Sequence, residues 1–388
     1  MLSTFSLFAQ VLGLINRDIF EDLVTRWGMD KGNKGFQTWH QFISMLFAQL
    51  ADSASLREIN LGLGSASGKL RHLGLTAAPC RSTLSYANAH RPWRFYEDLF
   101  YKVYEMVAEE AGKNGKKFRF KNPLYSLDSS TIELCLNVYD WARFRRTKGA
   151  IKLHMLLNNQ GCLPCWALIT DGKCADIKAA RLLEMRPGSI VVMDRGYNDF
   201  ELFDKWCRQG VFFVTRMKDN TLYEVSEVLE TPERSNVLSD EVIRLTGATA
   251  VKTCPNALRR VTVWDEKQQR ELVFITNIHH LAGSTIGMIY RQRWEIEIFF
   301  KALKQNLRIK TFLGTNENAV RTQIWTALIA ILLMMYLRMR AKWSWSLSQL
   351  VATFRTCMFA HKELWDWLAN PLPKSEQNLP QRYGLFPN

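Results

Sequence analysis

The sequence predicts an α/β protein in which a mixed sheet follows an all-α N-terminal region. As far as Gly112, apolar residues recur at spacings of three and four, which is typical of amphipathic helices. The pattern then changes to the alternation and short apolar runs of strands. With 388 residues, the chain is long enough for several modules that each bury an apolar interior. We expect parts bounded at 1–120, 121–216, 217–271, 272–340 and 341–388.

The first part reads as a bundle of short helices. Its clearest amphipathic face is formed by Phe36, Trp39, Phe42, Ile43, Leu46, Phe47 and Leu50. Ser55 and Glu58 have the spacing of a capping box, which marks a helix start. The segment Ser55–Arg94 resembles a helix-turn-helix, a motif whose last helix enters a DNA groove. We therefore expect Arg81 and Arg91 to contact DNA, with a plain helical bundle as the alternative.

The part from 121 to 216 reads as strands and helices of one mixed sheet. It follows a basic linker, KNGKKFRFK, at Lys113–Lys121. Strands are predicted at Leu124–Asp128, Ala150–Asn158, Cys162–Thr170, Ser189–Asp194 and Gly210–Arg216, and helices at Asp176–Glu184 and Asp199–Gln209. Three strands followed by alternating helix and strand is the order of a ribonuclease-H-like sheet.

The rest of the chain reads as an inserted β subdomain followed by helices. Met217–Glu271 shows strands separated by polar turns, and Leu272–Ile278 reads as a strand that rejoins the core. Ser284–Leu307 is predicted to be one long helix. The apolar run Ile324–Leu337 is shorter than the roughly 20 residues that span a membrane, so we expect a buried core helix and no membrane attachment. In the helical tail, the candidate contacts of a homodimer are Leu347, Val351 and Phe354.

Composition favours a polyanionic partner and a cytoplasmic location. Lys and Arg total 51 against 37 Asp and Glu, a net charge of +14. Nucleic acid fits this charge better than the alternative of a basic surface kept for solubility. The eight cysteines show no disulfide spacing, and the N-terminus has no pattern of a secretory signal. Cys162 and Cys165 form a CxxC without a second pair, so we expect packing rather than zinc, and we expect His154 to be structural.

Two aspartates are predicted to stand at the same rim of the sheet. Asp128 ends the strand PLYSLD, and Asp194 ends SIVVMD, whose apolar residues indicate burial on both faces. Ligand sites form at the carboxyl ends of strands in open α/β sheets. Adjacent carboxylates repel each other unless a cation neutralises them. Each aspartate alone could equally be a turn former or helix cap.

A glutamate on the long helix completes the set. At about 100° per residue, a stripe roughly 80° wide holds Tyr290, Arg293, Glu297, Lys301, Lys304 and Arg308. Apolar residues including Trp294 and Ile298 surround this stripe, which indicates a helix packed on most of its circumference. Glu295 lies nearly opposite, so Glu297 is the acid expected in the site. A salt-bridge ladder from Arg293 through Glu297 to Lys301 is the alternative.

Three carboxylates without a matching His or Cys cluster suit hard, oxygen-seeking cations. We therefore expect Mg2+, with Mn2+ able to substitute, and no small-molecule cofactor. Two such ions about 4 Å apart can activate an attacking oxygen and stabilise the leaving oxygen at phosphorus. We expect the cations of the stripe, Lys301 and Arg308 among them, to hold the DNA backbone, and a basic stripe at Arg145, Arg146 and Lys148 to assist.

These residues carry a family resemblance. Tyr290, Arg293, Glu297 and Lys304, with two, three and six residues between them, resemble the Y-R-E-K signature of the insertion-sequence-4 family of bacterial DDE transposases. SLDSST and VMDRGY are similar to the family's two aspartate motifs, and the resemblance spans roughly Phe36 to Arg340.

The resemblance implies a fold and residue roles. The fold is a ribonuclease-H-like core of the retroviral-integrase superfamily. Asp128, Asp194 and Glu297 would be metal ligands, and Tyr290, Arg293 and Lys304 would contact DNA near the cleavage point. Trp264, in VTVWDE, is similar in place to a tryptophan that supports a flipped base in relatives, with ordinary β packing as the alternative.

The predicted function is a transposase that binds the inverted-repeat ends of an insertion sequence, cleaves there and joins the freed 3′ hydroxyl to target DNA. The resemblance also implies a homodimer that pairs two element ends, in the cytoplasm at the nucleoid. The alternatives are a catalytically idle DNA-binding relic or repressor, and a host nuclease of the same fold that hydrolyses but never joins.

Overall fold

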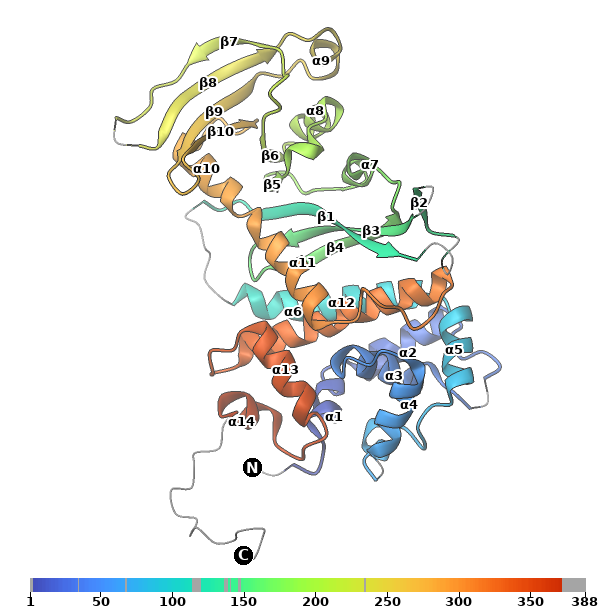
Figure 1. Cartoon of the computed structure of the whole chain (residues 1–388). Coiled ribbons are helices and arrows are strands. Elements are labelled where there is room, and N and C mark those ends of the chain that lie inside the picture. Colours follow the sequence, from blue (N-terminus) through green and yellow to red (C-terminus); the bar gives the residue numbers. More distant parts are fainter. Residues whose placement is uncertain are drawn as a thin grey trace, which may run out of the picture.

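Helices form the N-terminal part of the chain (Figure 1). The computed structural model describes residues 3–371 except 34, 67, 114–119, 136–138, 140, 146–147 and 234, and side chains are not described at 143–145 and 148. The first helices are α1 (Leu7–Leu12), α2 (Arg17–Arg26), α3 (Thr38–Leu50), α4 (Leu56–Ser65), the 3-10 helix η1 (Leu70–Leu73), α5 (Arg81–His90) and α6 (Arg94–Gly112). The Ser55 hydroxyl accepts the Glu58 N–H at 3.2 Å, so α4 begins where the capping pattern predicts.

A mixed sheet follows, which confirms the predicted α/β class. Its core strands are β1 (Leu124–Leu134), β2 (Arg143–Arg145), β3 (Lys148–Asn158), β4 (Leu163–Asp171), β5 (Ile190–Met193) and β6 (Phe212–Arg216). β4, β3 and β1 are antiparallel neighbours, and β1, β5 and β6 are parallel neighbours. This is the order expected of a ribonuclease-H-like sheet. Helix α7 (Asp176–Arg181), the 3-10 helix η2 (Arg195–Tyr197) and α8 (Phe200–Arg208) connect the later strands.

The strands expected in an inserted subdomain extend the same sheet. They are β7 (Tyr223–Val228), β8 (Val237–Leu245), β9 (Leu258–Asp265) and β10 (Arg270–Thr276), with α9 (Ala248–Thr253) between β8 and β9. β10 pairs antiparallel with β6, so the strand predicted to rejoin the core does so. The order then continues through β9 and β8 to β7. The free edge of β6 supplies hydrogen bonds that a separate sheet would have left unpaired.

The helix predicted at Ser284–Leu307 is broken in two. α10 (Gly283–Arg291) ends before Gln292, and α11 (Trp294–Asn306) begins after Arg293. The Gln292 carbonyl accepts hydrogen bonds from the Ser126 hydroxyl at 3.1 Å and from the Asn159 side chain at 3.3 Å. These two hydrogen bonds stabilise the break between α10 and α11. The helical periodicity of the sequence could not predict them, because both donors come from distant segments.

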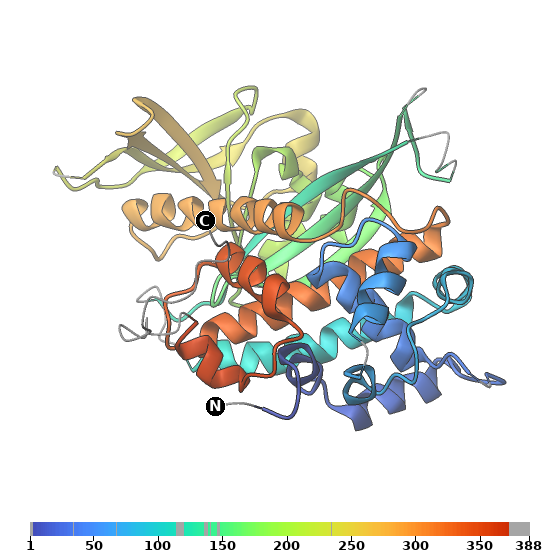
Figure 2. The same cartoon turned by 60° about the horizontal axis from the view of Figure 1, so that its bottom comes forward.

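Helix α12 (Glu317–Arg340) lies at the centre of the helical layer and is confirmed as a buried core helix. It is long and apolar enough to cross a membrane, yet 94% of its apolar window is buried inside the protein. One hydrophobic core joins it to the N-terminal helices, to one face of the sheet and to α13 (Leu347–Cys357) and α14 (Leu364–Ala369). Figure 2 shows the helices from both ends of the chain side by side.

This shared core changes two expectations. The backbone N–H groups of Leu7 and Phe8 donate to the carbonyls of Ala360 and Met358, so α1 is bonded to the segment between α13 and α14. The helices α1 to α6 therefore pack as part of a larger helical unit that includes the C-terminal helices. The dimer contact expected at Leu347, Val351 and Phe354 is wrong, because Val351 and Phe354 are buried and Leu347 packs against this core.

Candidate active site

The sheet register places Asp128 and Asp194 side by side. Parallel pairing of β1 with β5 sets Leu127 opposite Met193, and each aspartate is the next residue along its strand. β1 does not end at Asp128 as predicted but continues to Leu134 against β3, so Asp128 lies where the pairing with β5 stops. The Asp194 carboxylate accepts the Gly196 N–H at 2.7 Å and caps η2.

Arg293 links Asp128 to Glu297. Its guanidinium lies 2.5 Å from the Glu297 carboxylate and 3.9 Å from the Asp128 carboxylate. The Arg293 side chain is only 16% exposed, so this positive charge is held between the acids with little solvent around it. Helix α11 thus brings Glu297 to the rim where the aspartates stand.

The electrostatics of Asp128 reflect this crowding. Burial raises its pKa to about 6, and the nearby carboxylates of Glu297 and Asp194 act in the same direction. The Ser129 N–H, which donates to Asp128 at 2.8 Å, and the Arg293 guanidinium oppose the rise. The charged form of Asp128 therefore needs positive charge nearby, which a bound cation supplies.

The donor set fits a hard divalent cation better than zinc. The acids offer oxygen ligands, and Arg293 already places positive charge between two of them. In the described part of the chain, no three His, Cys, Asp or Glu side chains form a ready-made metal cluster, and Arg293 lies between two of the acids. The Cys165 thiol donates to the Leu156 carbonyl, and His154 bonds the Thr170 hydroxyl.

Tyr290 contacts Arg293, Lys304 contacts β1, and Trp264 shares a cavity with Tyr290. Tyr290 is a half-buried residue whose ring centroid is 5.8 Å from the Arg293 guanidinium carbon. The Lys304 ammonium donates to the Thr131 carbonyl of β1 at 3.3 Å. A cavity of about 330 Å³ between the sheet and α10 is lined by both Trp264 and Tyr290.

Other predicted DNA contacts lie elsewhere. The Arg91 guanidinium, 12% exposed, pairs with Asp30 at 3.0 Å and holds the helices together, whereas Arg81 is exposed at the start of α5. Arg308 lies beyond α11 and bonds the carboxylate and carbonyl of Asp52. Lys301 is exposed on α11.

The basic stripe falls partly outside the described residues. The backbones of Arg145 and Lys148 lie in β2 and β3, and their side chains are not described. Arg146 lies outside the described residues.

The α11 surface also differs from the prediction. Trp294 and Ile298 were expected to pack against the core, but they are 59% and 49% exposed. The buried residues of α11 are Ile296, Phe299, Phe300 and Leu303, so the helix packs on one face rather than on most of its circumference. Glu295 contacts Cys162, whose thiol donates to it at 3.6 Å, and so it faces away from Asp128.

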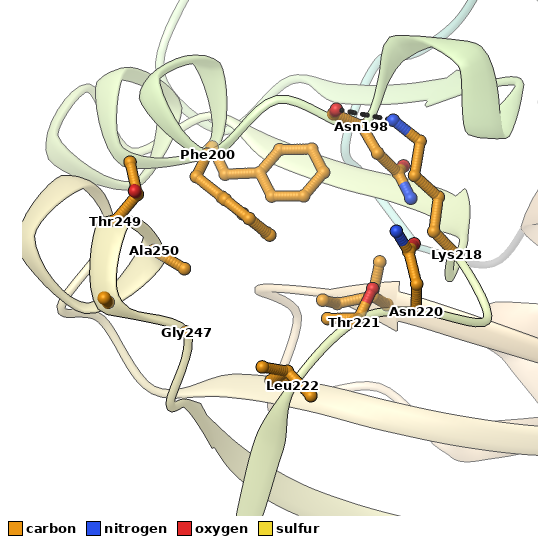
Figure 3. A pocket seen from close by; sticks show the side chains of 12 residues that line it. Asn198, Phe200, Lys218, Asn220, Thr221, Leu222, Gly247, Thr249 and Ala250 are labelled. Atoms are coloured by element: carbon orange, nitrogen blue, oxygen red, sulfur yellow. Dashed lines mark hydrogen bonds between the residues drawn. The ribbon is translucent and has the colours of Figure 1, made fainter.

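Sequence reasoning missed the residues beside Asp194. A shallow hollow there is lined by Asp194, Arg195, Gly196, Lys218, Asp219 and Asn220. Lys218 and Asn220 also line a deeper cavity of about 380 Å³ between α8, α9 and β10, shown in Figure 3. The Lys218 ammonium donates to the Asn198 carbonyl at its rim. A signal existed in the sequence, because these residues directly follow β6, which is parallel to β5 and ends at the same rim.

Comparisons with known proteins identify the family of the chain. The family model described as a transposase DDE domain matches residues 119–333. A second model, described as a domain of unknown function (DUF4372), matches residues 3–76. A probable transposase for insertion sequence element IS5377 from Geobacillus stearothermophilus is 29% identical over 272 residues, covering 70% of this chain and 71% of the relative.

Further relatives are more distant. A putative transposase of Sinorhizobium fredii, y4zB, is 28% identical and covers 66% of this chain and 71% of that protein. The piggyBac transposase synaptic complex with hairpin DNA aligns at 11% identity with a TM-score of 0.43, covering 88% of this chain and 78% of that chain.

Proposed function

Because the chain belongs to the family of the transposase DDE domain, it is a DNA transposase, and we propose that Asp128, Asp194 and Glu297 bind its divalent metal ions. The observation that carries this proposal is the convergence of the three acids, with Arg293 bridging two of them. Divalent metal dependence is general in this family. We propose Mg2+ as the ion, with Mn2+ able to substitute, because the ligands are all carboxylates.

Bound at these carboxylates, the ions would activate an attacking oxygen and stabilise the leaving oxygen at a DNA phosphate. The chain's own groups position the DNA. The bridging Arg293 is set to exchange its carboxylate partners for a phosphate when the ions enter, because a guanidinium pairs with either. Tyr290 lies beside Arg293, and Lys304 lies further along α11 against β1; both would hold the neighbouring DNA backbone. Water can enter at the partly exposed Glu297.

The DNA substrate is proposed to be the inverted-repeat ends of an insertion sequence. The relative from Geobacillus stearothermophilus is named as a probable transposase for an insertion sequence element, and the Y-R-E-K residues are present at Tyr290, Arg293, Glu297 and Lys304. These support membership of the insertion-sequence-4 family. We further propose that two protomers pair two ends, at the nucleoid in the cytoplasm.

A cleavage and joining assay tests the function. The full-length protein is incubated with Mg2+, a labelled duplex that carries the repeat flanking its coding region, and a supercoiled target plasmid. We expect nicks at the repeat boundary and labelled DNA joined to the plasmid. Binding without nicking would indicate a relic or repressor, and nicking without joining would indicate a host nuclease.

The Glu295→Gln variant is expected to cleave DNA at a rate within about threefold of the native rate, whereas the Glu297→Gln variant is expected to be inactive. The reason is that Glu297 faces Asp128 through Arg293, whereas Glu295 contacts Cys162. Single-turnover nicking of the two purified variants measures the difference. Equal loss in two folded variants would mean that the acids of α11 have been assigned to the wrong sides.

In the N-terminal helices, Arg81→Ala is expected to weaken DNA binding without loss of stability. Arg81 is exposed, so a phosphate contact would be lost and the salt dependence of binding would fall by about one unit of slope. Arg91→Ala should instead lower stability, because it leaves Asp30 without its partner. Fluorescence anisotropy at several salt concentrations and denaturant unfolding of the full-length variants measure both effects. Unchanged binding by Arg81→Ala would remove α5 from the DNA interface.

A further inference from the structure

A polar cluster lies on the face of the sheet opposite Arg293. Side chains alternate along a strand, so Ser129 points away from the side on which Asp128 meets Arg293. The Ser129 hydroxyl donates to the Asp176 carboxylate at 2.7 Å. The Lys152 ammonium of β3 donates to the same oxygen at 3.1 Å. The cluster therefore ties β1 and β3 to the first residue of α7.

The ion pair between Lys152 and Asp176 lies at the centre of this cluster. Lys152 is 16% exposed and also donates to the Cys174 carbonyl at 3.0 Å. His154 is fully buried, with its Nδ1 3.5 Å from Asp176 and its Nε2 2.9 Å from the Thr170 hydroxyl. Burial lowers the pKa of His154 to about 4, so its ring is neutral near pH 7. Lys152 is thus the cation that balances Asp176.

Two contacts lead from this cluster to the acids of the site. The Ser129 N–H donates to the Asp128 carboxylate at 2.8 Å. Tyr197 lies three residues after Asp194 in η2, and its buried hydroxyl stands beside Ser129. Burial, and then the carboxylates of Asp128 and Asp176, raise the pKa of Tyr197. Ser129 therefore belongs to the strand that carries Asp128 and lies beside a residue of the turn that follows Asp194.

We propose that Asp176 is a positioning residue: it fixes Ser129, and through Ser129 the orientation of Asp128 and its separation from Asp194. This role rests on the proposed function of those two acids. It acts from behind the sheet, without touching DNA or a metal ion, as the hydrogen-bonded supports of metal ligands do.

The geometry favours this role over simple stabilisation of α7. The side chain at the N-cap position, Ala175, makes no capping bond, and the Asp176 carboxylate turns to the sheet rather than to the helix's own N–H groups. The Asp176 side chain is 35% exposed, and partly exposed ion pairs contribute little to stability. Stability alone therefore gives little reason for three polar side chains from two strands to meet here.

The test is direct Mn2+ binding by the full-length protein, measured from the electron paramagnetic resonance signal of free Mn2+. We expect Asp176→Ala to bind Mn2+ about tenfold more weakly and to nick DNA with a lower kcat at saturating DNA. Asp176→Asn keeps an acceptor for Ser129 and should stay within about threefold of the native protein. The matched control is Asp171→Ala, which removes a nearby carboxylate that accepts the Cys174 N–H in the same turn.

Thermal unfolding of each variant separates positioning from folding. Native-like unfolding together with weak Mn2+ binding in Asp176→Ala, rescued in Asp176→Asn, supports the proposal. If Asp176→Ala is too unstable to measure, Ser129→Ala removes the same link and is expected to show the same tenfold loss. The proposal is overturned if Asp176→Ala or Ser129→Ala binds Mn2+ with native affinity. It is also overturned if Asp176→Ala and Asp171→Ala lose equal Mn2+ affinity. If the Asp128→Asn variant binds Mn2+ as tightly as the native protein does, the proposed metal function itself fails.

Discussion

Asp128→Asn, Asp194→Asn and Glu297→Gln are each expected to reduce strand cleavage below detection while DNA binding persists. Each change keeps the size of the side chain and removes one negative charge from the group of acids. A divalent ion loses a charged ligand in each case, and the ions provide both activation of the nucleophile and stabilisation of the leaving oxygen. DNA is held mainly by cations around the site, which these variants retain.

Binding and nicking of the same end DNA measure the two functions separately. Electrophoretic mobility shift in Ca2+ reports binding, and a denaturing gel after addition of Mg2+ reports nicking. Ser130→Ala is a suitable control, because Ser130 is a buried hydroxyl on the same strand that the proposed ligand set does not include. Native-like nicking by any one of the three variants would remove that residue from the proposed site.

The two aspartates could be predicted because local sequence determines where a buried parallel strand lies. The run IVVM of β5 is buried on both faces, and the residue after it must stand at the rim. The glutamate could be predicted because Arg293 and Glu297 are four residues apart and remain neighbours across the helix start. Both inferences depend on contacts within a few residues of each other.

Contacts between distant segments could not be read in the same way. The break at Gln292 depends on Ser126 and Asn159, which are 166 and 133 residues away in sequence. The partner of Arg308 is Asp52, which is 256 residues away in sequence. A basic residue in the sequence looks the same whether it will meet a phosphate or a carboxylate of its own chain. The sequence therefore assigns Arg91 to DNA from a segment that resembles a helix-turn-helix, and Arg308 from a stripe on a predicted helix, although both meet carboxylates of their own chain.

The sheet extension gives a second example, because a buried ion pair fixes the start of α10 to it. The Arg259 guanidinium of β9 makes two bonds to the Asp240 carboxylate of β8, at 2.7 and 2.6 Å. The same guanidinium donates to the carbonyls of Ile278 and Leu281, just before α10. Both side chains of the pair are at most 5% exposed. The alternation of β8 and β9 predicts strands but not this pairing.

Arg259→Ala is expected to lower the free energy of unfolding by about 3–5 kcal/mol, because it leaves the Asp240 charge buried without a partner. Denaturant unfolding measures this loss. Arg260→Ala, which removes the next and more exposed pair with Glu241, should cost less stability.

Replacing both residues of the buried pair, by Arg259→Met with Asp240→Leu, should recover much of the stability. That double variant still lacks the bonds to Ile278 and Leu281, so α10 and its Tyr290 lose their anchor and DNA cleavage should remain reduced. Full cleavage by a stable double variant would show that this anchor does not place Tyr290.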